Sequence, residues 1–454
     1  MRRALLWLLL ALCAASPAAA AGQFLALSDI HFDPMADPSL VDRLNAAAPE
    51  DWAKIFASSS DKSLGRYGRD TDWPLLSSAL SAMKEALPHP DFVVMTGDFL
   101  AHSFRVHFDL TARNHSDAAY RAFIERTMRF LALQLERAFP KTPILPVLGN
   151  NDSYCGDYRL TPGGAFLKDV EPTMRGLLGG AAGAGFAGHW RGLGNYAVRL
   201  PRLPHVRVAG LDTVFFSAHY SAACAGAAKG DPGKASLAWL AGTLAAARRA
   251  HERVWLLYHV PPGIDDYATA RFGACPQNIV PLWQPAYQTA FAALLKEYAD
   301  TIAASLAGHL HTDAFRLADR TALTLVIPAI SPIFGENPGF KTISYDSAGR
   351  LDDATTYELP SLSGGAAWVE EYRFTSEWRL PRLDLASLDR LYRRIGGEPR
   401  TRARWLSLYA LSNASFWPAE AAERAKRSRA AYCAGGHLSA TGFATCYCPA
   451  SGNK

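Results

Sequence analysis

Residues 23–31 read Gln-Phe-Leu-Ala-Leu-Ser-Asp-Ile-His, and this stretch contains the pattern from which the fold can be inferred. Its first part, Gln23–Leu27, is a short and mostly apolar run, and Asp29 and His31 follow it directly. Short, continuous runs that are rich in Val, Ile, Leu or Phe are typical of strands buried on both faces. The stretch therefore predicts a buried strand with Asp29 and His31 just beyond its carboxyl end.

Four more runs of this kind occur along the chain, and helical patterns separate them. The runs are Asp91–Met95, Pro143–Leu148, Arg253–Tyr258 and Ile302–Ala307. Apolar residues recur at helical spacing in Trp73–Ala86, Ala118–Phe139, Ala235–His251 and Ala286–Ala299. Strands that alternate with helices predict an α/β fold.

A second group of apolar runs has less helix between its members. These runs are Asn195–Leu200, His205–Leu211, Ala322–Ile327 and Lys341–Tyr345, and they predict either a second sheet or an extension of the first. The stretch 179–194 is dominated by Gly and Ala, so we expect a flexible surface loop there. Pro, Ser and a Gly pair in 359–367 predict a boundary between a catalytic domain over residues 22–366 and a mostly helical extension over residues 367–454.

The composition excludes some classes of protein. The chain has 454 residues, of which 49% are hydrophobic and 20% are charged, so a large core is expected and global disorder is not. Lys and Arg exceed Asp and Glu by only 47 to 42, which argues against a dedicated binder of nucleic-acid polymers.

The first residues predict export. Arg2 and Arg3 precede an apolar run over Ala4–Ala15, and small residues at positions 18–20 suit cleavage, as in a secretory signal peptide over residues 1–21. An N-terminal membrane anchor is the alternative, but the run is short against the ~20 residues of a spanning helix. We expect a mature protein that is secreted or periplasmic.

The cysteines agree with this compartment. Cys13 lies in the predicted signal peptide, and an even number remain: Cys155, Cys224, Cys275, Cys433, Cys446 and Cys448. An even number in an oxidising compartment predicts disulfides, although six cysteines allow 15 pairings. We expect Cys433 to join Cys446 or Cys448, and a zinc site at the Cys-x-Cys pair is the competing interpretation.

Residues with metal-ligand chemistry follow every one of the five buried runs. Ligands of open α/β sheets bind outside the carboxyl ends of the strands, so these residues should meet in one place. They are Asp29, His31, Asp98, Asn150, His259, His309 and His311. Each motif alone is weak, because Asp and His are common in loops and Gly-Asp is often a turn. The joint occurrence at five strand ends is what predicts a site.

Carboxylates, an amide and imidazoles suit Zn²⁺, Mn²⁺ or Fe. Seven ligands are too many for one tetrahedral ion and suit two ions ~3.5–4 Å apart that share a carboxylate. Gly97, Gly149 and Gly308 adjoin the ligands and would allow the backbone to turn sharply and approach closely.

The series DIH, GD, GNND, YHVPPG and GHLH resembles the calcineurin-like metallophosphoesterase superfamily. Within it, SDIHFDP, GDFLAH, HVPPG and the cysteine-containing C-terminal extension are similar to the acid sphingomyelinase-like phosphodiesterases, over about residues 24–357. The resemblance implies two packed mixed β-sheets flanked by helices (α/β/β/α), with a smaller, mostly helical, disulfide-containing C-terminal region. It also implies two divalent metal ions, for which we expect zinc. Asp29, His31 and His311 would hold one ion, Asn150, His259 and His309 the other, and Asp98 would bridge them.

The resemblance further implies an exported phosphodiesterase, acting on a sphingomyelin-like phosphocholine lipid or a nucleotide derivative by attack of a hydroxide held between the cations. The family commonly protonates the leaving group with the His of a GNH motif, but Asn151 occupies that position here. An amide is no general acid, so we expect His102, four residues after Asp98, to take the role. Asn151 would then hydrogen-bond a phosphoryl oxygen, or would simply be a turn residue.

Other functions remain open at this point. They are a phosphomonoesterase of the same superfamily, a non-catalytic binding protein on this scaffold, and a metal-dependent amidohydrolase, whose HxH belongs on the first strand rather than the last. We expect a monomer that binds a small-molecule or lipid phosphodiester. A lipid substrate would be compatible with peripheral contact with a membrane.

Overall fold

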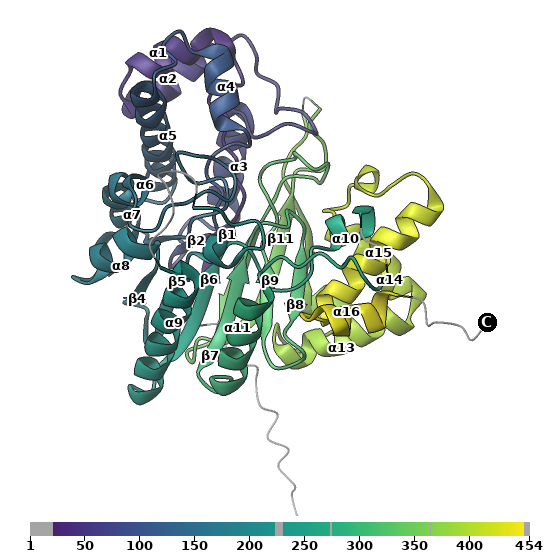
Figure 1. The fold of residues 1–454 in the computed structure, drawn as a ribbon. Coiled ribbons are helices and arrows are strands. Elements are labelled where there is room, and N and C mark those ends of the chain that lie inside the picture. The colour runs from purple at the N-terminus through teal and green to yellow at the C-terminus, as the bar shows by residue number, and fades with distance from the viewer. Residues whose placement is uncertain (1–20, 223–229, 273–274, 364, 449–454) are drawn as a thin grey trace, which may run out of the picture.

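The computed structural model describes residues 21–222, 230–272, 275–363 and 365–448. Cys224 and the predicted signal peptide, apart from its last residue, lie outside these ranges. Two six-stranded mixed sheets form the centre of the protein (Figure 1). The architecture predicted from the family resemblance, two mixed sheets flanked by helices, is confirmed.

The first sheet has the strand order β12-β11-β10-β1-β2-β3. Its strands are β1 (Gly22–Leu27), β2 (Val93–Met95), β3 (Ile144–Pro146), β10 (Gly339–Tyr345), β11 (Leu351–Glu358) and β12 (Val369–Arg373). Strands β1, β2 and β3 are parallel, with Leu27 opposite Met95 and Met95 opposite Pro146. This register brings the segments after the three strands to the same edge of the sheet.

The second sheet has the order β4-β5-β6-β7-β9-β8. Its strands are β4 (Tyr196–Leu200), β5 (Leu203–Leu211), β6 (Arg253–Tyr258), β7 (Ile302–Ala307), β8 (Ala314–Leu317) and β9 (Leu323–Val326). The five buried runs thus divide between two sheets, and the second group of runs divides as well, because β10 joins the first sheet. An apolar run indicates burial but does not specify which strand lies beside it, so this division was not predicted.

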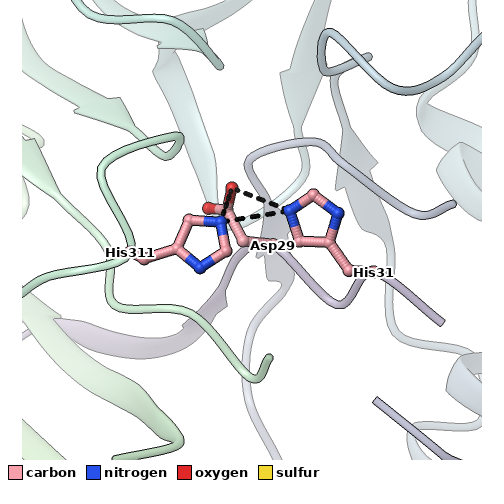
Figure 2. Close-up of side chains that lie close together, drawn as sticks. All are labelled: Asp29, His31 and His311. Atoms are coloured by element: carbon pink, nitrogen blue, oxygen red, sulfur yellow. Dashed lines mark hydrogen bonds and ion pairs between the residues drawn. The ribbon is translucent and has the colours of Figure 1, made fainter. Parts of the chain in front are cut away.

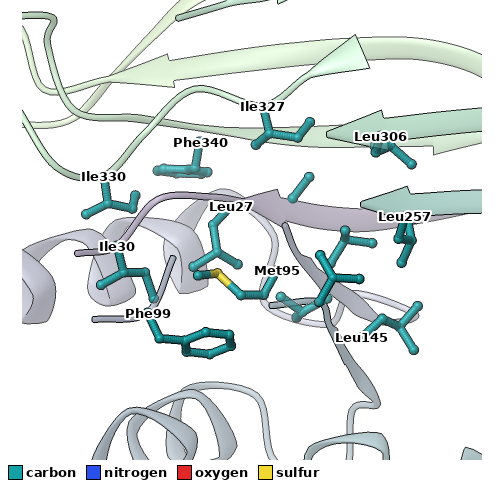
Figure 3. Close-up of a cluster of buried hydrophobic side chains, with 14 of the residues drawn as sticks. Leu27, Ile30, Met95, Phe99, Leu145, Leu257, Leu306, Ile327, Ile330 and Phe340 are labelled. Carbon is teal, nitrogen blue, oxygen red and sulfur yellow. The ribbon is translucent and has the colours of Figure 1, made fainter. Parts of the chain in front are cut away.

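The main core lies between the two sheets. Figure 3 shows Leu27, Met95 and Leu145 of the first sheet facing Leu257 and Leu306 of the second. All five side chains are fully buried. The strand ends that carry the candidate ligands therefore rest on rigid, doubly covered strands.

Helices cover the outer faces of the sheets. The four predicted helices are confirmed to within a few residues as α3 (Trp73–Ala86), α5 (Asp117–Ala138), α9 (Pro232–Arg249) and α11 (Pro285–Glu297). Shorter helices are α1 (Val41–Ala46), α2 (Trp52–Ala57), α4 (Phe104–Thr111), α6 (Ala165–Asp169), α7 (Glu171–Leu178), α8 (Phe186–Leu193) and α10 (Asp266–Phe272). On the second sheet, α9 and α11 bury Leu240, Leu244 and Phe291 against β5 and β6.

The flexible loop predicted over residues 179–194 is wrong. A 3-10 turn at Gly179–Ala181 leads into helix α8, in which Phe186 and Trp190 are buried and stack with ring centroids 5.5 Å apart. Two aromatic side chains four residues apart lie on one helix face, and their burial outweighs the low helix propensity of the surrounding glycines.

The C-terminal region is helical, as predicted, and appears in yellow-green to yellow in Figure 1. It contains α12 (Phe374–Trp378), α13 (Leu385–Gly397), α14 (Pro399–Tyr409), α15 (Ala421–Gly436) and α16 (Ala440–Tyr447). A disulfide joins Cys433 to Cys446, which confirms the expected local pairing, and a second joins Cys275 to Cys448. Strand β12 pairs with β11 just beyond the predicted boundary at residue 366, and that boundary stays a prediction.

Among the residues that the structure describes, no helix combines the length and the apolar composition that crossing a bilayer requires.

Candidate metal centre

The seven predicted ligands converge at the carboxyl ends of five strands. Asp29 and His31 follow β1, Asp98 follows β2, and Asn150 follows β3, while His259 follows β6 and both His309 and His311 follow β7. All of these residues are buried except His309, which is half-buried. The two sheets thus contribute to one site, and no single sheet holds it.

Asp29, His31 and His311 form the first of two ligand groups (Figure 2). Nε2 of His311 lies 3.4 Å from Oδ1 of Asp29, and Nε2 of His31 lies 3.7 Å from the same oxygen. The two Nε2 atoms are 3.1 Å apart. Two imidazole nitrogens and a carboxylate oxygen that face one another suit a cation between them.

The second group consists of Asp98, His259 and His309, with Asn150 beside it. Nε2 of His259 lies 3.2 Å from Oδ2 of Asp98 and 3.0 Å from Oδ1 of Asn150. Oδ2 of Asp98 is also 3.3 Å from Nε2 of His31, in the first group. Asp98 therefore lies between the two groups, where a shared carboxylate is expected.

Neighbouring acceptors orient three of the rings. Nδ1–H of His31 donates to the carbonyl of Leu100 (3.1 Å), and Nδ1–H of His259 donates to the carbonyl of Thr96 (2.7 Å). Nδ1–H of His311 donates to Oε1 of Glu336 (2.9 Å). A ring that donates through Nδ1 presents the lone pair of Nε2, which is how metal-binding histidines are usually held. Sequence reasoning missed Glu336, for which no motif gave a signal.

The amide of Asn150 is oriented in the same way. Its Nδ2 donates to Oδ1 of Asp157 at 2.7 Å, which turns Oδ1 of Asn150 toward His259. Asp157 was also missed, although it follows the GNND motif closely and its residue type gave the only available signal.

The backbone is strained at the ligands. Five of the seven have a positive φ although none is glycine: Asp29 (49°), His31 (44°), Asp98 (54°), His309 (72°) and His311 (60°). Such conformations are uncommon for L-residues, cost of order 1–3 kcal/mol each, and cluster at functional sites. The strain indicates that these loops are shaped for a site rather than for stability.

The electrostatics favour bound positive charge. Burial alone would lower the pKa of His259, yet Asp98 and Asp29 raise it to about 10. At His311, burial likewise lowers the pKa and Asp29 raises it, and the resulting pKa is about 9. Burial and the neighbouring His259 lower the pKa of His309 to about 3. The carboxylates thus stabilise positive charge at their centre, which a divalent cation would supply in place of protons.

The family model of the calcineurin-like phosphoesterases matches residues 22–313. The chain belongs to this family. The matched residues include all five strand ends and all seven candidate ligands of this phosphoesterase.

Curated relatives match most of the chain. An acid sphingomyelinase-like phosphodiesterase 3b of Mus musculus is 28% identical over 87% of this chain and 83% of its own length. A sphingomyelinase phosphodiesterase D of Dictyostelium discoideum is 27% identical over 78% and 80%. A cyclic GMP-AMP phosphodiesterase of Rattus norvegicus is 25% identical over 83% and 81%.

A cavity of about 260 Å³ opens onto the ligands of the phosphoesterase. Asn150, His309 and His311 line one part of it, and Tyr409 and Arg427 of the C-terminal helices line another. The C-terminal region therefore contributes part of the wall of this cavity.

His102 and Asn151 differ in their relation to this cavity. His102 is half-buried and lines it, with its ring stacked on that of His31 at a centroid distance of 4.1 Å. Asn151 is buried, and its backbone N–H and Nδ2 donate to the two oxygens of Asp98 at 2.8 and 3.0 Å. The amide thus holds the carboxylate of Asp98, and the expected contact with a phosphoryl oxygen stays a prediction.

Proposed function

We propose that this phosphoesterase hydrolyses phosphodiesters with two divalent cations, zinc by preference. Asp29, His31 and His311 would hold one cation, and Asn150, His259 and His309 the other, with Asp98 shared. One observation supports the proposal above the others: two groups of ligand atoms, each within 4.8 Å of one another, adjoin a cavity and meet at Asp98.

Bound cations would neutralise charge on the phosphoryl oxygens and make hydroxide available near neutral pH. The chain supplies the remaining chemistry. Asn151 keeps Asp98 in place through two hydrogen bonds. His102 lines the cavity, and we assign to it the general acid. A hydroxide oxygen would form a bond to phosphorus as the bond from phosphorus to the leaving oxygen breaks. Nε2–H of His102 gives its proton to that leaving oxygen, and the leaving group departs as an alcohol.

The names of the relatives support two substrate classes. One relative is named an acid sphingomyelinase-like phosphodiesterase and another a sphingomyelinase phosphodiesterase, whereas a third is named a cyclic GMP-AMP phosphodiesterase. We propose a phosphocholine lipid or a nucleotide derivative as substrate. A panel of sphingomyelin, a CDP-alcohol, ATP and a cyclic dinucleotide, each with and without chelator, tests this. Turnover of none of them by protein with two metal equivalents would count against the proposal.

The alternative phosphomonoesterase function is separated by two chromogenic substrates. A diesterase should hydrolyse bis-p-nitrophenyl phosphate faster than p-nitrophenyl phosphate, and a monoesterase should show the opposite order. The replacement of the GNH histidine by Asn151 is the feature that favours a non-catalytic binding protein, and metal content without any diester turnover would support that function.

We also propose that the mature protein is secreted or periplasmic. Disulfides Cys433–Cys446 and Cys275–Cys448 support an oxidising compartment. N-terminal sequencing of the exported protein should find a first residue near position 22.

A further inference from the structure

A carboxylate outside the seven ligands holds His102. Oδ1 of Asp70 accepts a hydrogen bond from Nδ1 of His102 at 3.0 Å, and Oδ2 accepts one from its backbone N–H at 2.8 Å. Ser331 donates to Oδ1 of Asp70 at 3.2 Å. The side chain of Asp70 is only 3% exposed. The buried carboxylate is therefore held by three hydrogen-bond donors, two from His102 and one from Ser331.

The backbone beside Asp70 is fixed to the segment that carries His31. Thr71 N–H donates to the carbonyl of His31 at 3.1 Å, and Asp33 N–H donates to the carbonyl of Thr71 at 2.8 Å. Asp70 and the first ligand group therefore belong to one hydrogen-bonded unit. A change in the position of Asp70 would have to break this short stretch of pairing.

We propose that Asp70 is a positioning residue for the reaction, which it serves by fixing the ring of His102. Because Asp70 occupies Nδ1 and the backbone N–H, Nε2 is the nitrogen left to face the cavity that His102 lines. The stacking on His31 fixes the plane of the ring. This inference rests on the proposed function, because it assumes that His102 protonates a leaving oxygen.

Asp70 keeps its own charge in this scheme. One proton moves from Nε2 of His102 to the leaving oxygen as the bond to phosphorus breaks, and Nδ1–H stays hydrogen-bonded to Asp70. Metal binding is the competing role, because ligand atoms of His31, Asp70 and His102 also lie within 4.8 Å of one another and resemble a third cation site. The two-point contact of Asp70 with His102 favours positioning, and metal content separates the two roles.

The test compares two methyl aryl phosphates that differ only in the leaving group. Phenolate is basic and needs a proton as it leaves, whereas 4-nitrophenolate is a good leaving group and does not. For Asp70→Asn with its metals bound, we expect kcat on the phenyl diester to fall about 10–100-fold, which is part of the roughly 10²–10⁴-fold that a general acid contributes, and kcat on the nitrophenyl diester to fall less than about threefold.

The chain offers a matched control. Oδ2 of Asp33 and Nδ1 of His107 form a second Asp–His pair at 3.1 Å, and neither residue lines the cavity. Asp33→Asn should leave the ratio of the two rates unchanged. If it lowers that ratio as Asp70→Asn does, the effect is not specific to His102 and the proposal is overturned.

A double mutant decides whether Asp70 acts through His102. In the His102→Ala background, Asp70→Asn should cause no further loss on the phenyl diester, whereas a multiplied loss would overturn the proposal. If Asp70→Asn does not fold, Asp70→Ser takes its place in the same comparisons. A third metal equivalent that disappears in either Asp70 variant would assign metal binding instead. Failure of the wild type to hydrolyse both diesters would refute the proposed function itself.

Discussion

Gly97→Ala should disable the centre while leaving most of the fold intact. Gly97 has a φ of 98°, and an added Cβ would lie 2.7 Å from Nδ1 of His259 and 2.9 Å from the backbone nitrogen of Gly149. Real Cβ atoms essentially never approach closer than 3.0 Å, so His259 must retreat by at least 3.0 − 2.7 = 0.3 Å. The backbone strain costs about 1–3 kcal/mol and the overpacking another 1–3 kcal/mol, or about 2–6 kcal/mol together.

This cost is a large part of the 5–15 kcal/mol that typically stabilises a folded protein, so the variant should fold with a lower free energy of unfolding. The retreat of His259 also disturbs its hydrogen bond to Thr96, and such changes around ligands typically lower metal affinity about 10–100-fold. Urea unfolding, metal content and the rate on bis-p-nitrophenyl phosphate measure the three effects.

Gly188→Ala is the control, because its added Cβ would have no atom within 4 Å and it lies within helix α8. It should raise the free energy of unfolding by about 0.5–1 kcal/mol and leave metal content unchanged. The reasoning is refuted if Gly97→Ala unfolds within about 0.5 kcal/mol of the wild type and retains both metals, because the close packing around position 97 would then have no consequence.

Three further predictions follow from the contacts described. Glu336→Gln removes the charge that faces Nδ1 of His311 and should lower metal affinity about 10–100-fold in a chelator competition. Glu358→Gln is the control, because Glu358 accepts a hydrogen bond from Asn337 and the substitution should leave metal affinity unchanged. Dialysis against a chelator should abolish diester hydrolysis and lower the melting temperature. Metal added back at 1,000 times its Kd should raise the free energy of unfolding by about 4 kcal/mol. Hydrolysis that survives removal of all metal would contradict the proposed metal centre. Cys448→Ser opens a link between residues 173 apart and should lower the free energy of unfolding by about 2–4 kcal/mol; Cys275→Ser should lower it equally, and the double variant should show no further loss.

The strand ends were predictable because two signals coincide there. The first signal is an apolar run such as Gln23–Leu27, which indicates a buried strand. The second is a polar residue of metal-ligand type after the run, such as Asp29, and the structure of a strand end does not require such a residue after all five runs. The division of the runs between two sheets was not predictable, since pairing depends on contacts far apart in the sequence, such as those between β1 and β10. The prediction of a surface loop at 179–194 was wrong because the burial of Phe186 and Trp190, and not the Gly-rich composition, determines the structure of this stretch.

Residues that support the ligands were harder to find than the ligands. Glu336 and Asp70 lie in irregular segments, so no periodicity marks them. Asp70 precedes His102 by 32 residues, and only the folded chain brings the two within hydrogen-bonding distance. Asn151 was identified as a departure from the family pattern, but its hydrogen bonds to Asp98 depend on a turn geometry that the sequence does not specify.

The strained ligand loops keep their shape because they hydrogen-bond to one another. Asp29 N–H donates to the carbonyl of Gly97 at 3.0 Å, and His31 N–H donates to the carbonyl of Asp98 at 2.9 Å. His309 N–H donates to Oδ2 of Asp29 at 3.0 Å, which ties the second sheet to the first. Because the loops support one another, contacts within the chain itself hold the candidate ligands in this arrangement. The left-handed backbone at these residues is thus offset by contacts within the site, which is why it survives in a centre built from five separate strands.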